Sequence, residues 1–215
     1  MNITLTNTGK RYNREWIFRH CDYEFNSGKN YAITGPNGSG KSTLLQVIAG
    51  ATLHNEGTIE FIREQRTSTL FPLASPKVDS EQHYTLISLA APYLELIEEM
   101  TAKEMLDFHS GFKPLTEILS VEDILEIVGL KSAINKQVRY FSSGMKQRLK
   151  LAQAFFSNTP VLLLDEPTTN LDADGIALYH NLISNYTKDK LVIVSSNVKQ
   201  EYDFCEEVIE IAKYK

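Results

Sequence analysis

Residues 35–42 read GPNGSGKS, and Thr43 follows them. The preceding run, Tyr31–Thr34, is short and largely apolar, which is typical of a buried β-strand. The following run, Lys41–Ala49, has leucine and isoleucine at helical spacing and stops at Gly50, a residue that commonly ends a helix. A glycine-rich turn of this spacing between a strand and a helix predicts an α/β fold built around a phosphate-binding loop.

The chemistry of this loop follows from its residue types. Glycines let the backbone curl so that successive amide hydrogens point toward phosphate oxygens, and the positive end of the next helix lies beneath them. Lys41 is predicted to reach the β- and γ-phosphates, and the Ser42 hydroxyl is predicted to bind magnesium. The expected nucleotide-binding residues are Gly35, Asn37, Gly38, Ser39, Gly40, Lys41, Ser42 and Thr43.

Two carboxylates follow a second apolar run. Val161–Leu164 is followed directly by Asp165 and Glu166. The carboxyl ends of strands in α/β sheets are where ligands bind. Asp165 is therefore expected to hold magnesium, directly or through water, and Glu166 to orient or deprotonate an attacking water. Glu166 and Lys41 are the predicted catalytic residues.

Composition limits the class of protein. The 215 residues suffice for one domain, and the 42% of hydrophobic residues argue against general disorder. The net charge of -5 makes nucleic acid an improbable main partner. Cys21 and Cys205 are far apart and are expected to be reduced thiols of a cytosolic protein. Neither a signal peptide nor an apolar run of transmembrane length is evident, so work at a membrane would need another chain.

Apolar runs that alternate with helical patterns predict a mostly parallel sheet, preceded by an antiparallel β subdomain at the N-terminus. A helical block at about 90–157 interrupts this alternation, and it is interpreted as a helical subdomain inserted into a single domain of residues 1–215. Thr101 and Glu104 have the spacing of a capping box. Residues 63–82 are expected to form a loop or an irregular hairpin. The other expected strands are Ile3–Leu5, Trp16–Phe18, Thr58–Ile62 and Leu191–Val194, and the other expected helices are Ile118–Val128, Gly144–Phe156 and Gly175–Asn185.

Residues 140–148 read YFSSGMKQR, and residues 164–168 read LDEPT. With the loop at 35–42, these stretches make the chain resemble the ABC ATPase family, whose signature reads LSGGQ. Here residues 141–145 read FSSGM: Ser142 and the final glycine, Gly144, are kept, while Ser143 replaces the first glycine and Met145 replaces the glutamine. The resemblance implies a P-loop NTPase core that binds ATP and magnesium. It also implies that Ser142 and Gly144 face the γ-phosphate held by a second subunit, although a capped amphipathic helix is the simpler interpretation of this segment alone.

The resemblance places two further elements. Tyr12 lies where the family has an aromatic ring that stacks on adenine, although a merely packed tyrosine is the alternative. Residues 169–172, TNLD, resemble the loop that joins the two subunits of the dimer.

Two positions depart from the family pattern. Pro92 falls nearest the place of an expected glutamine that contacts magnesium and the attacking water. Ser196 or Asn197 takes the place of an expected histidine that contacts the γ-phosphate, and Asn197 is assigned to the nucleotide site. An amide or hydroxyl can form hydrogen bonds to phosphate but cannot supply a cation. Hydrolysis is therefore expected to be slow in the isolated protein.

Together these features predict the ATP-binding subunit of an ABC transporter. It would be a cytoplasmic protein, peripheral at the inner face of the cell membrane through a separate transmembrane permease subunit, and would form a homodimer or an ABC heterodimer with ATP between the subunits. The segment Ala90–Met100 is expected to dock the permease, with ordinary packing of a helix start as the alternative. The alternative functions are a non-transport ABC protein acting on the ribosome or DNA, and an ATP-dependent assembly module with little turnover.

Overall fold

The computed structural model describes residues 1–63 and 80–215, so most of the loop or hairpin expected at 63–82 lies outside the described residues. The strands are β1 (Asn2–Tyr12), β2 (Glu15–Phe25), β3 (Asn30–Thr34), β4 (Glu56–Ile62), β5 (Ile87–Ala90), β6 (Val161–Asp165), β7 (Leu191–Ser195) and β8 (Glu207–Glu210). The helices are α1 (Lys41–Ile48), α2 (Ala102–Ser110), α3 (Val121–Ile127), α4 (Ser143–Phe156), α5 (Ala173–Tyr186) and α6 (Lys199–Tyr202).

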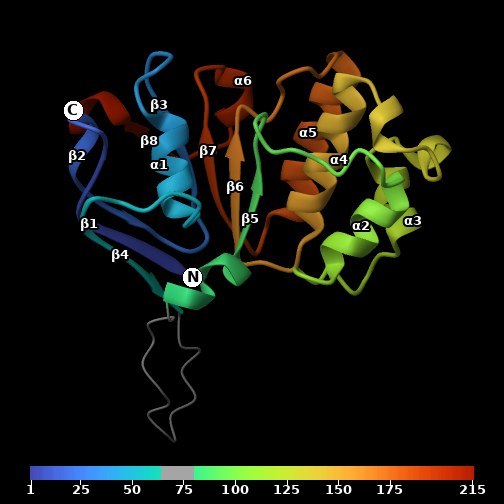
Figure 1. Ribbon diagram of the computed structural model, residues 1–215, viewed down its shortest axis with the longest axis horizontal. Coiled ribbons are helices and arrows are strands. Elements are labelled where there is room, and N and C mark those ends of the chain that lie inside the picture. The colour runs from blue at the N-terminus through green and yellow to red at the C-terminus, as the bar shows by residue number, and fades with distance from the viewer. Residues whose placement is uncertain (64–79) are drawn as a thin grey trace, which may run out of the picture.

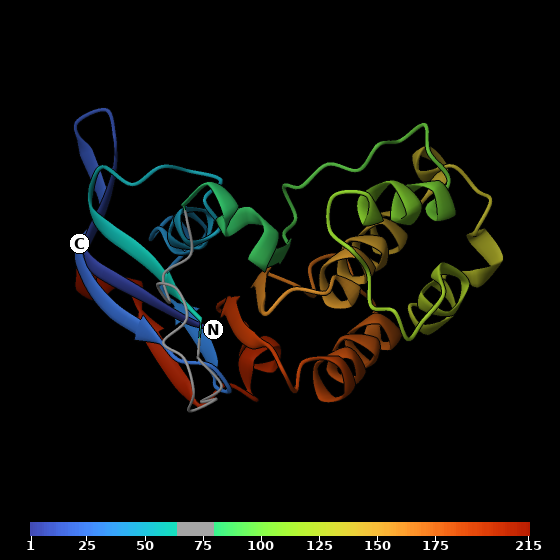
Figure 2. The same cartoon turned by 90° about the horizontal axis from the view of Figure 1, so that it is seen from below.

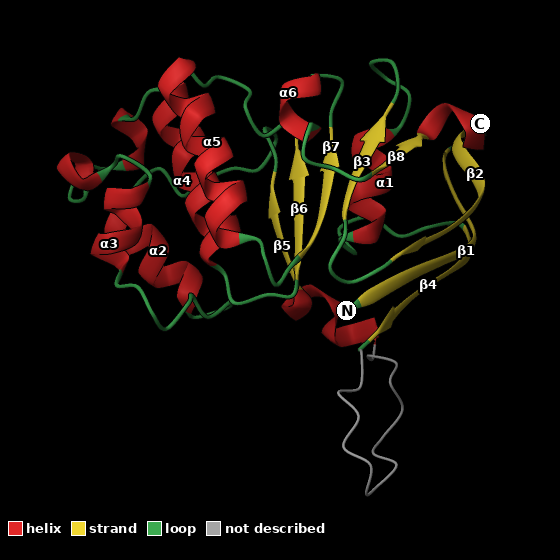
Figure 3. Ribbon diagram, turned by 180° about the vertical axis from the view of Figure 1, so that it is seen from behind, coloured by secondary structure: helices red, strands yellow, loops and turns green. Residues whose placement is uncertain are grey.

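The core of the fold is a five-stranded sheet in the order β5-β6-β7-β3-β8, and every neighbouring pair in it is parallel. The carboxyl ends of its central strands point the same way, toward α6 (Figure 3). A three-stranded antiparallel sheet, in the order β2-β1-β4, lies beside α1 at the opposite end of the molecule from α2 and α3 (Figure 1). The predicted α/β class, the parallel sheet and the antiparallel N-terminal strands are confirmed.

Successive residues of β6 face opposite sides of the sheet, as the period of a strand requires. Val161 and Leu163 pack in a core with α1 and the antiparallel sheet. Leu162 and Leu164 pack in a second core with helices α2–α5. All four side chains are fully buried, which explains why β6 reads as a continuous apolar run. The parallel sheet is thus covered on both faces (Figure 2).

The helical layer contains two capping boxes. Thr101 and Glu104 form the predicted one at the start of α2. Ser120 and Asp123 form a second at the start of α3, so this helix begins at Val121 and not at Ile118 as predicted. Ile118 lies outside the helix with 90% of its surface exposed, because the Ser120 cap fixes the first helical residue after it. The boundaries of the helical subdomain at about 90–157 stay a prediction.

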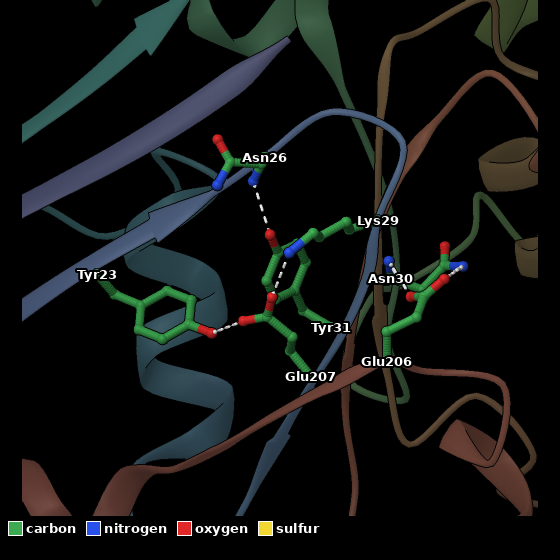
Figure 4. Close-up of polar contacts among 7 residues, drawn as sticks. All are labelled: Tyr23, Asn26, Lys29, Asn30, Tyr31, Glu206 and Glu207. Carbon is green, nitrogen blue, oxygen red and sulfur yellow. Dashed lines mark hydrogen bonds and ion pairs between the residues drawn. The ribbon is translucent and has the colours of Figure 1, made fainter.

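Polar contacts tie β8 to the end of the β2–β3 connection (Figure 4). The carboxylate of Glu207 accepts hydrogen bonds from the Tyr23 hydroxyl at 2.9 Å and the Lys29 ammonium at 2.6 Å. The carboxylate of Glu206 accepts a hydrogen bond from the backbone nitrogen of Asn30 at 2.6 Å. These contacts hold β8 against β3, so the strand that leads into the glycine-rich loop has a paired neighbour on each side.

Candidate functional site

The glycine-rich loop lies between β3 and α1, as predicted. Gly35 and Gly40 both have positive φ, 149° and 105°, a region that other residues rarely adopt. A Cβ at Gly40 would lie 2.5 Å from the side chain of Ile17, so the close approach also requires glycine. Gly40 is the N-cap of α1, and the first turn of α1 contains no acidic residue. The amide end of this helix is therefore a positive site suited to an anion.

Lys41 is folded back over its own loop. Its side chain is almost fully buried, and its ammonium donates hydrogen bonds to the carbonyl oxygens of Gly35 at 2.8 Å and Pro36 at 3.3 Å. An ammonium held by two neutral carbonyls keeps its whole charge available to an anion that enters the loop. The geometry therefore fits the predicted contact of Lys41 with phosphate.

Three buried side-chain oxygens of the described residues have no hydrogen-bond partner: Ser39 Oγ, Asp165 Oδ1 and Ser195 Oγ. They belong to the glycine-rich loop and to the carboxyl ends of β6 and β7. Since buried polar groups of folded proteins are almost always paired, unpaired oxygens in this loop and at these strand ends indicate the place of a ligand.

Asp165 ends β6 with only 1% of its surface exposed. Burial raises the pKa of its carboxyl, and the nearby hydroxyls of Ser195 and Ser42, together with the charge of Lys41, lower it in part. A buried carboxylate oxygen next to a serine hydroxyl suits magnesium, which takes oxygen ligands and usually keeps few protein ligands beside phosphate and water. Ser42 and Asp165 thus fit the predicted metal ligands.

Glu166 follows Asp165 and has a φ of 42°, which is uncommon for a residue with a side chain. Its amide nitrogen donates to the Ser195 carbonyl at 2.9 Å, which fixes the turn after β6 against the end of β7. Glu166 lines a cavity of about 220 Å³ whose other lining residues are Ile17, Asn37, Gly38, Ser39, Gly40, Lys41, Ser42 and Thr43. The predicted base and most of the predicted phosphate-binding residues therefore share one cavity.

The loop after β7 places its two polar residues in different surroundings. Ser196 is fully buried; its hydroxyl donates to Glu201 and accepts from the Val198 amide at 2.9 Å. Asn197 instead faces the glycine-rich loop. Its Nδ2 donates to Asn37 Oδ1 at 3.1 Å, and its Oδ1 accepts from the Gly35 amide at 3.3 Å. Of the two residues that the sequence left open, Asn197 is the one directed at the site.

The loop after β5 carries Pro92, the residue nearest the place of the glutamine expected from the family pattern. The carbonyl oxygen of Pro92 accepts from the Lys150 ammonium at 2.7 Å. Burial and the charge of Asp165 raise the pKa of the Tyr93 phenol, while a hydrogen bond with Gln46 lowers it in part. Tyr93 does not line the cavity of the glycine-rich loop.

The signature segment and Tyr12 lie apart from this cavity. Ser142 is the N-cap of α4, and its Oγ accepts from the Met145 amide at 3.2 Å. Gly144 lies close to the loop after β6: a Cβ there would be 3.1 Å from the Asn170 carbonyl oxygen. Tyr12 is 47% exposed at the end of β1, with the Lys10 ammonium 4.8 Å from its ring centre. None of the three lines the cavity within one chain, so their assignment to the nucleotide site stays a prediction.

A parallel sheet with a phosphate-type loop after β3 and two carboxylates at the carboxyl end of β6 defines a P-loop nucleotide-binding protein. The family model for ABC transporters matches residues 18–169. The uncharacterized ABC transporter ATP-binding protein YybJ of Bacillus subtilis is 30% identical over 212 residues, covering 97% of this chain and 92% of that protein. The cytochrome c biogenesis ATP-binding export protein CcmA of Rhizobium etli is 32% identical over 201 residues, covering 92% of this chain and 88% of that protein.

Solved structures share the fold. An ATP-binding subunit of an ABC transporter superposes with a TM-score of 0.79 at 22% identity, covering 99% of this chain and 87% of that one. A bacterial ABC transporter cassette, solved as a dimer, has a TM-score of 0.77 at 23% identity, covering 98% of this chain and 95% of that one. The chain therefore belongs to the family of ABC transporter ATP-binding proteins, as the sequence predicted.

Proposed function

We propose that the chain binds and hydrolyses ATP with magnesium and thereby drives a separate membrane-embedded permease. The observation that supports this most is the single cavity in which Lys41, Ser42 and Glu166 meet, next to the unpaired carboxylate oxygen of Asp165. None of the helices described in residues 1–63 and 80–215 combines the length and apolar character needed to cross a bilayer. We propose that a separate chain supplies the membrane-spanning helices and holds this one at the inner face of the membrane.

In this mechanism the glycine-rich loop and Lys41 bind the β- and γ-phosphates. Ser42 and Asp165 would hold magnesium, which supplies positive charge against the charge that develops on the transferring phosphoryl group. Glu166 orients the attacking water and accepts its proton. The Oδ1 of Asn197 lies 3.3 Å from the backbone nitrogen of Gly35, so this side chain lies against the loop. Its Nδ2, which donates to Asn37 in the structure, donates instead to the γ-phosphate when ATP is bound. The amide stabilises the transition state less than a cation would, so turnover is slow.

A second copy, or a related ABC chain, would complete the site. Ser142 and Gly144 lie at the positive end of α4 but outside the cavity of their own chain. A head-to-tail dimer would place them against the γ-phosphate held by the partner, with ATP between the subunits. The dimeric arrangement of the similar bacterial cassette supports this proposal.

The permease would dock beside the loop after β5. A groove of about 360 Å³ is lined there by apolar residues, among them Leu94, Leu96 and Met105, and by the lysines Lys113 and Lys150. Burial lowers the pKa of both lysines, and each ammonium donates to a backbone carbonyl at 2.7 Å. An apolar floor with polar groups around it is suited to a short segment of a partner protein. Tyr93, which was expected to contribute to this surface, does not line the groove.

A second candidate function is an ATP-dependent assembly module with little turnover. It is favoured by the neutral amide of Asn197 and by Pro92, which stand where the family pattern has polar groups that accelerate hydrolysis. The experiment that separates the two is ATP turnover by the wild type and Glu166→Gln. Magnesium-dependent turnover that needs Glu166 supports the transporter ATPase, and ATP binding without measurable turnover supports the assembly module.

A further inference from the structure

Glu201 is a carboxylate buried inside the protein at the carboxyl end of the sheet. It lies on the one-turn helix α6, with 2% of its surface exposed. Removing a carboxylate from water costs several kcal/mol unless hydrogen bonds replace the lost hydration. The partners that satisfy Glu201 therefore show what the residue is built to hold.

Its two carboxylate oxygens bind two different loops. One oxygen, Oε1, accepts from both the backbone amide of Thr168, at 2.8 Å, and the Thr168 hydroxyl. The other, Oε2, accepts from the hydroxyl of Ser196. The backbone carbonyl of Glu201 is held in turn by the hydroxyl of Tyr179 on α5, at 2.6 Å. The carboxylate is thus a bridge between the loop after β6 and the loop after β7.

Each of these loops contains a residue of the proposed mechanism. Thr168 is two residues beyond Glu166, and Ser196 directly precedes Asn197. We propose that Glu201 is a positioning residue, which fixes the distance between the base Glu166 and the phosphate-facing Asn197 through Thr168 and Ser196. This inference rests on the proposed ATPase function and adds to it a residue outside the cavity.

The same loop also receives a contact from the signature helix. The side-chain amide of Gln147 on α4 donates to the carbonyl oxygen of Pro167 at 2.7 Å, and Gln147 is itself buried. The loop after β6 is therefore held between α4 on one side and Glu201 on the other. The partner's nucleotide is proposed to bind at the start of α4. If α4 moves, the loop after β6 would move with it, and Glu201 would transmit this movement to Ser196 and Asn197.

The experiment measures kcat for ATP hydrolysis and the dissociation constant of a fluorescent ATP analogue in Thr168→Val, Ser196→Ala, the double variant and Glu201→Gln. The first two substitutions each remove one hydroxyl from the bridge and keep the backbone bond of Thr168. We expect each to lower kcat about tenfold while the dissociation constant changes less than about threefold. Because both act on one bridge, the double variant should lose little more than either single variant.

A matched control is the buried hydroxyl pair Ser88 and Thr159, 2.9 Å apart near the amino ends of β5 and β6, away from the cavity. Ser88→Ala with Thr159→Val should lower the melting temperature and leave kcat unchanged. The inference is overturned if the Thr168, Ser196 and Glu201 variants behave like this control, or if the Thr168 and Ser196 effects simply multiply. A wild type without turnover would overturn the proposed function as well, whereas turnover that needs Glu166 but not Glu201 would overturn only this inference.

Discussion

The side chain of Asn197 is hydrogen-bonded to that of Asn37 at 3.1 Å, across the gap between the end of β7 and the glycine-rich loop. The same side chain also accepts from the Gly35 amide. Asn197 therefore ties the end of β7 to the glycine-rich loop. An asparagine at this position contributes order to the loop but no positive charge.

Asn197→His should accelerate hydrolysis. A transition-state contact of this kind is typically worth a hundred- to thousandfold in rate, of which the amide already supplies part. We expect turnover to rise about tenfold or more, with little change in affinity for a fluorescent ATP analogue. Ser196→His is the matched control, because its imidazole would replace a fully buried hydroxyl and lower the melting temperature instead. Unchanged turnover in Asn197→His, or acceleration in Ser196→His, would contradict the assignment.

Asp165→Asn should stabilise the protein while it removes the response to magnesium. Burial raises the pKa of Asp165 above its unfolded value, so this group's contribution to stability is greatest at low pH and decreases as pH rises toward the folded pKa. Asparagine has no charge to bury, so at neutral pH the melting temperature without metal should rise by a few degrees, at about 2–4 °C per kcal/mol. Thermal melts with and without magnesium and ATP test this. A wild type and variant that melt alike under both conditions would refute it.

A dimer should form when ATP is bound but cannot be hydrolysed. Light scattering of Glu166→Gln with magnesium and ATP should give twice the mass measured without ATP, because the α4 end of each subunit would close the other's site. Adding Lys41→Ala to this variant should restore the monomer by weakening nucleotide binding. A mass that does not change with ATP at high protein concentration, even with the permease added, counts against the proposed assembly.

Leu94→Ala with Leu96→Ala should weaken the docking of a membrane partner. Truncating an interface anchor costs more than about 1 kcal/mol, so the pair should reduce co-purification about tenfold or more. The measurement uses the permease subunit that co-purifies with the wild-type chain, and Ile118→Ala is the control because Ile118 is exposed away from the groove. Equal recovery of the partner with the groove variant and the control would refute the docking site and leave the ATPase proposal intact.

The sequence predicted the elements whose patterns are strong and local. Tyr31–Thr34, the glycine-rich loop and the helix from Lys41 correspond to β3, the loop and α1 almost residue for residue. Here strand pattern, glycine positions and helix spacing all agree. Strand β8 was not predicted, because Glu207–Glu210 reads EVIE, which places only two apolar residues between two acids and shows no clear strand period. Its place beside β3 depends on contacts with residues about 180 positions earlier in the chain.

The sequence predicted the site residues whose roles are fixed by a motif. It did not predict the residues whose positions depend on packing in the folded protein. Asp165 ends β6 and Glu166 follows it, because an apolar strand that ends in acids places them at the ligand-binding edge. The sequence could not tell whether Ser196 or Asn197 faces the nucleotide site. In the structure the Ser196 hydroxyl donates to the buried carboxylate of Glu201, so Asn197 is the one that faces the site. Glu201 was not predicted, because its partner Thr168 lies 33 positions earlier in the chain and is brought to it only by folding.

The most direct test of the central claim is the rate of magnesium-dependent ATP hydrolysis by the wild type and by Glu166→Gln. The wild type should turn over ATP slowly but measurably. Glu166→Gln should reduce that rate a hundredfold or more while binding of an ATP analogue persists, because general-base catalysis typically contributes a hundred- to ten-thousandfold. Lys41→Ala should instead lose the binding itself. A wild type that hydrolyses ATP at the same rate as Glu166→Gln would contradict the account.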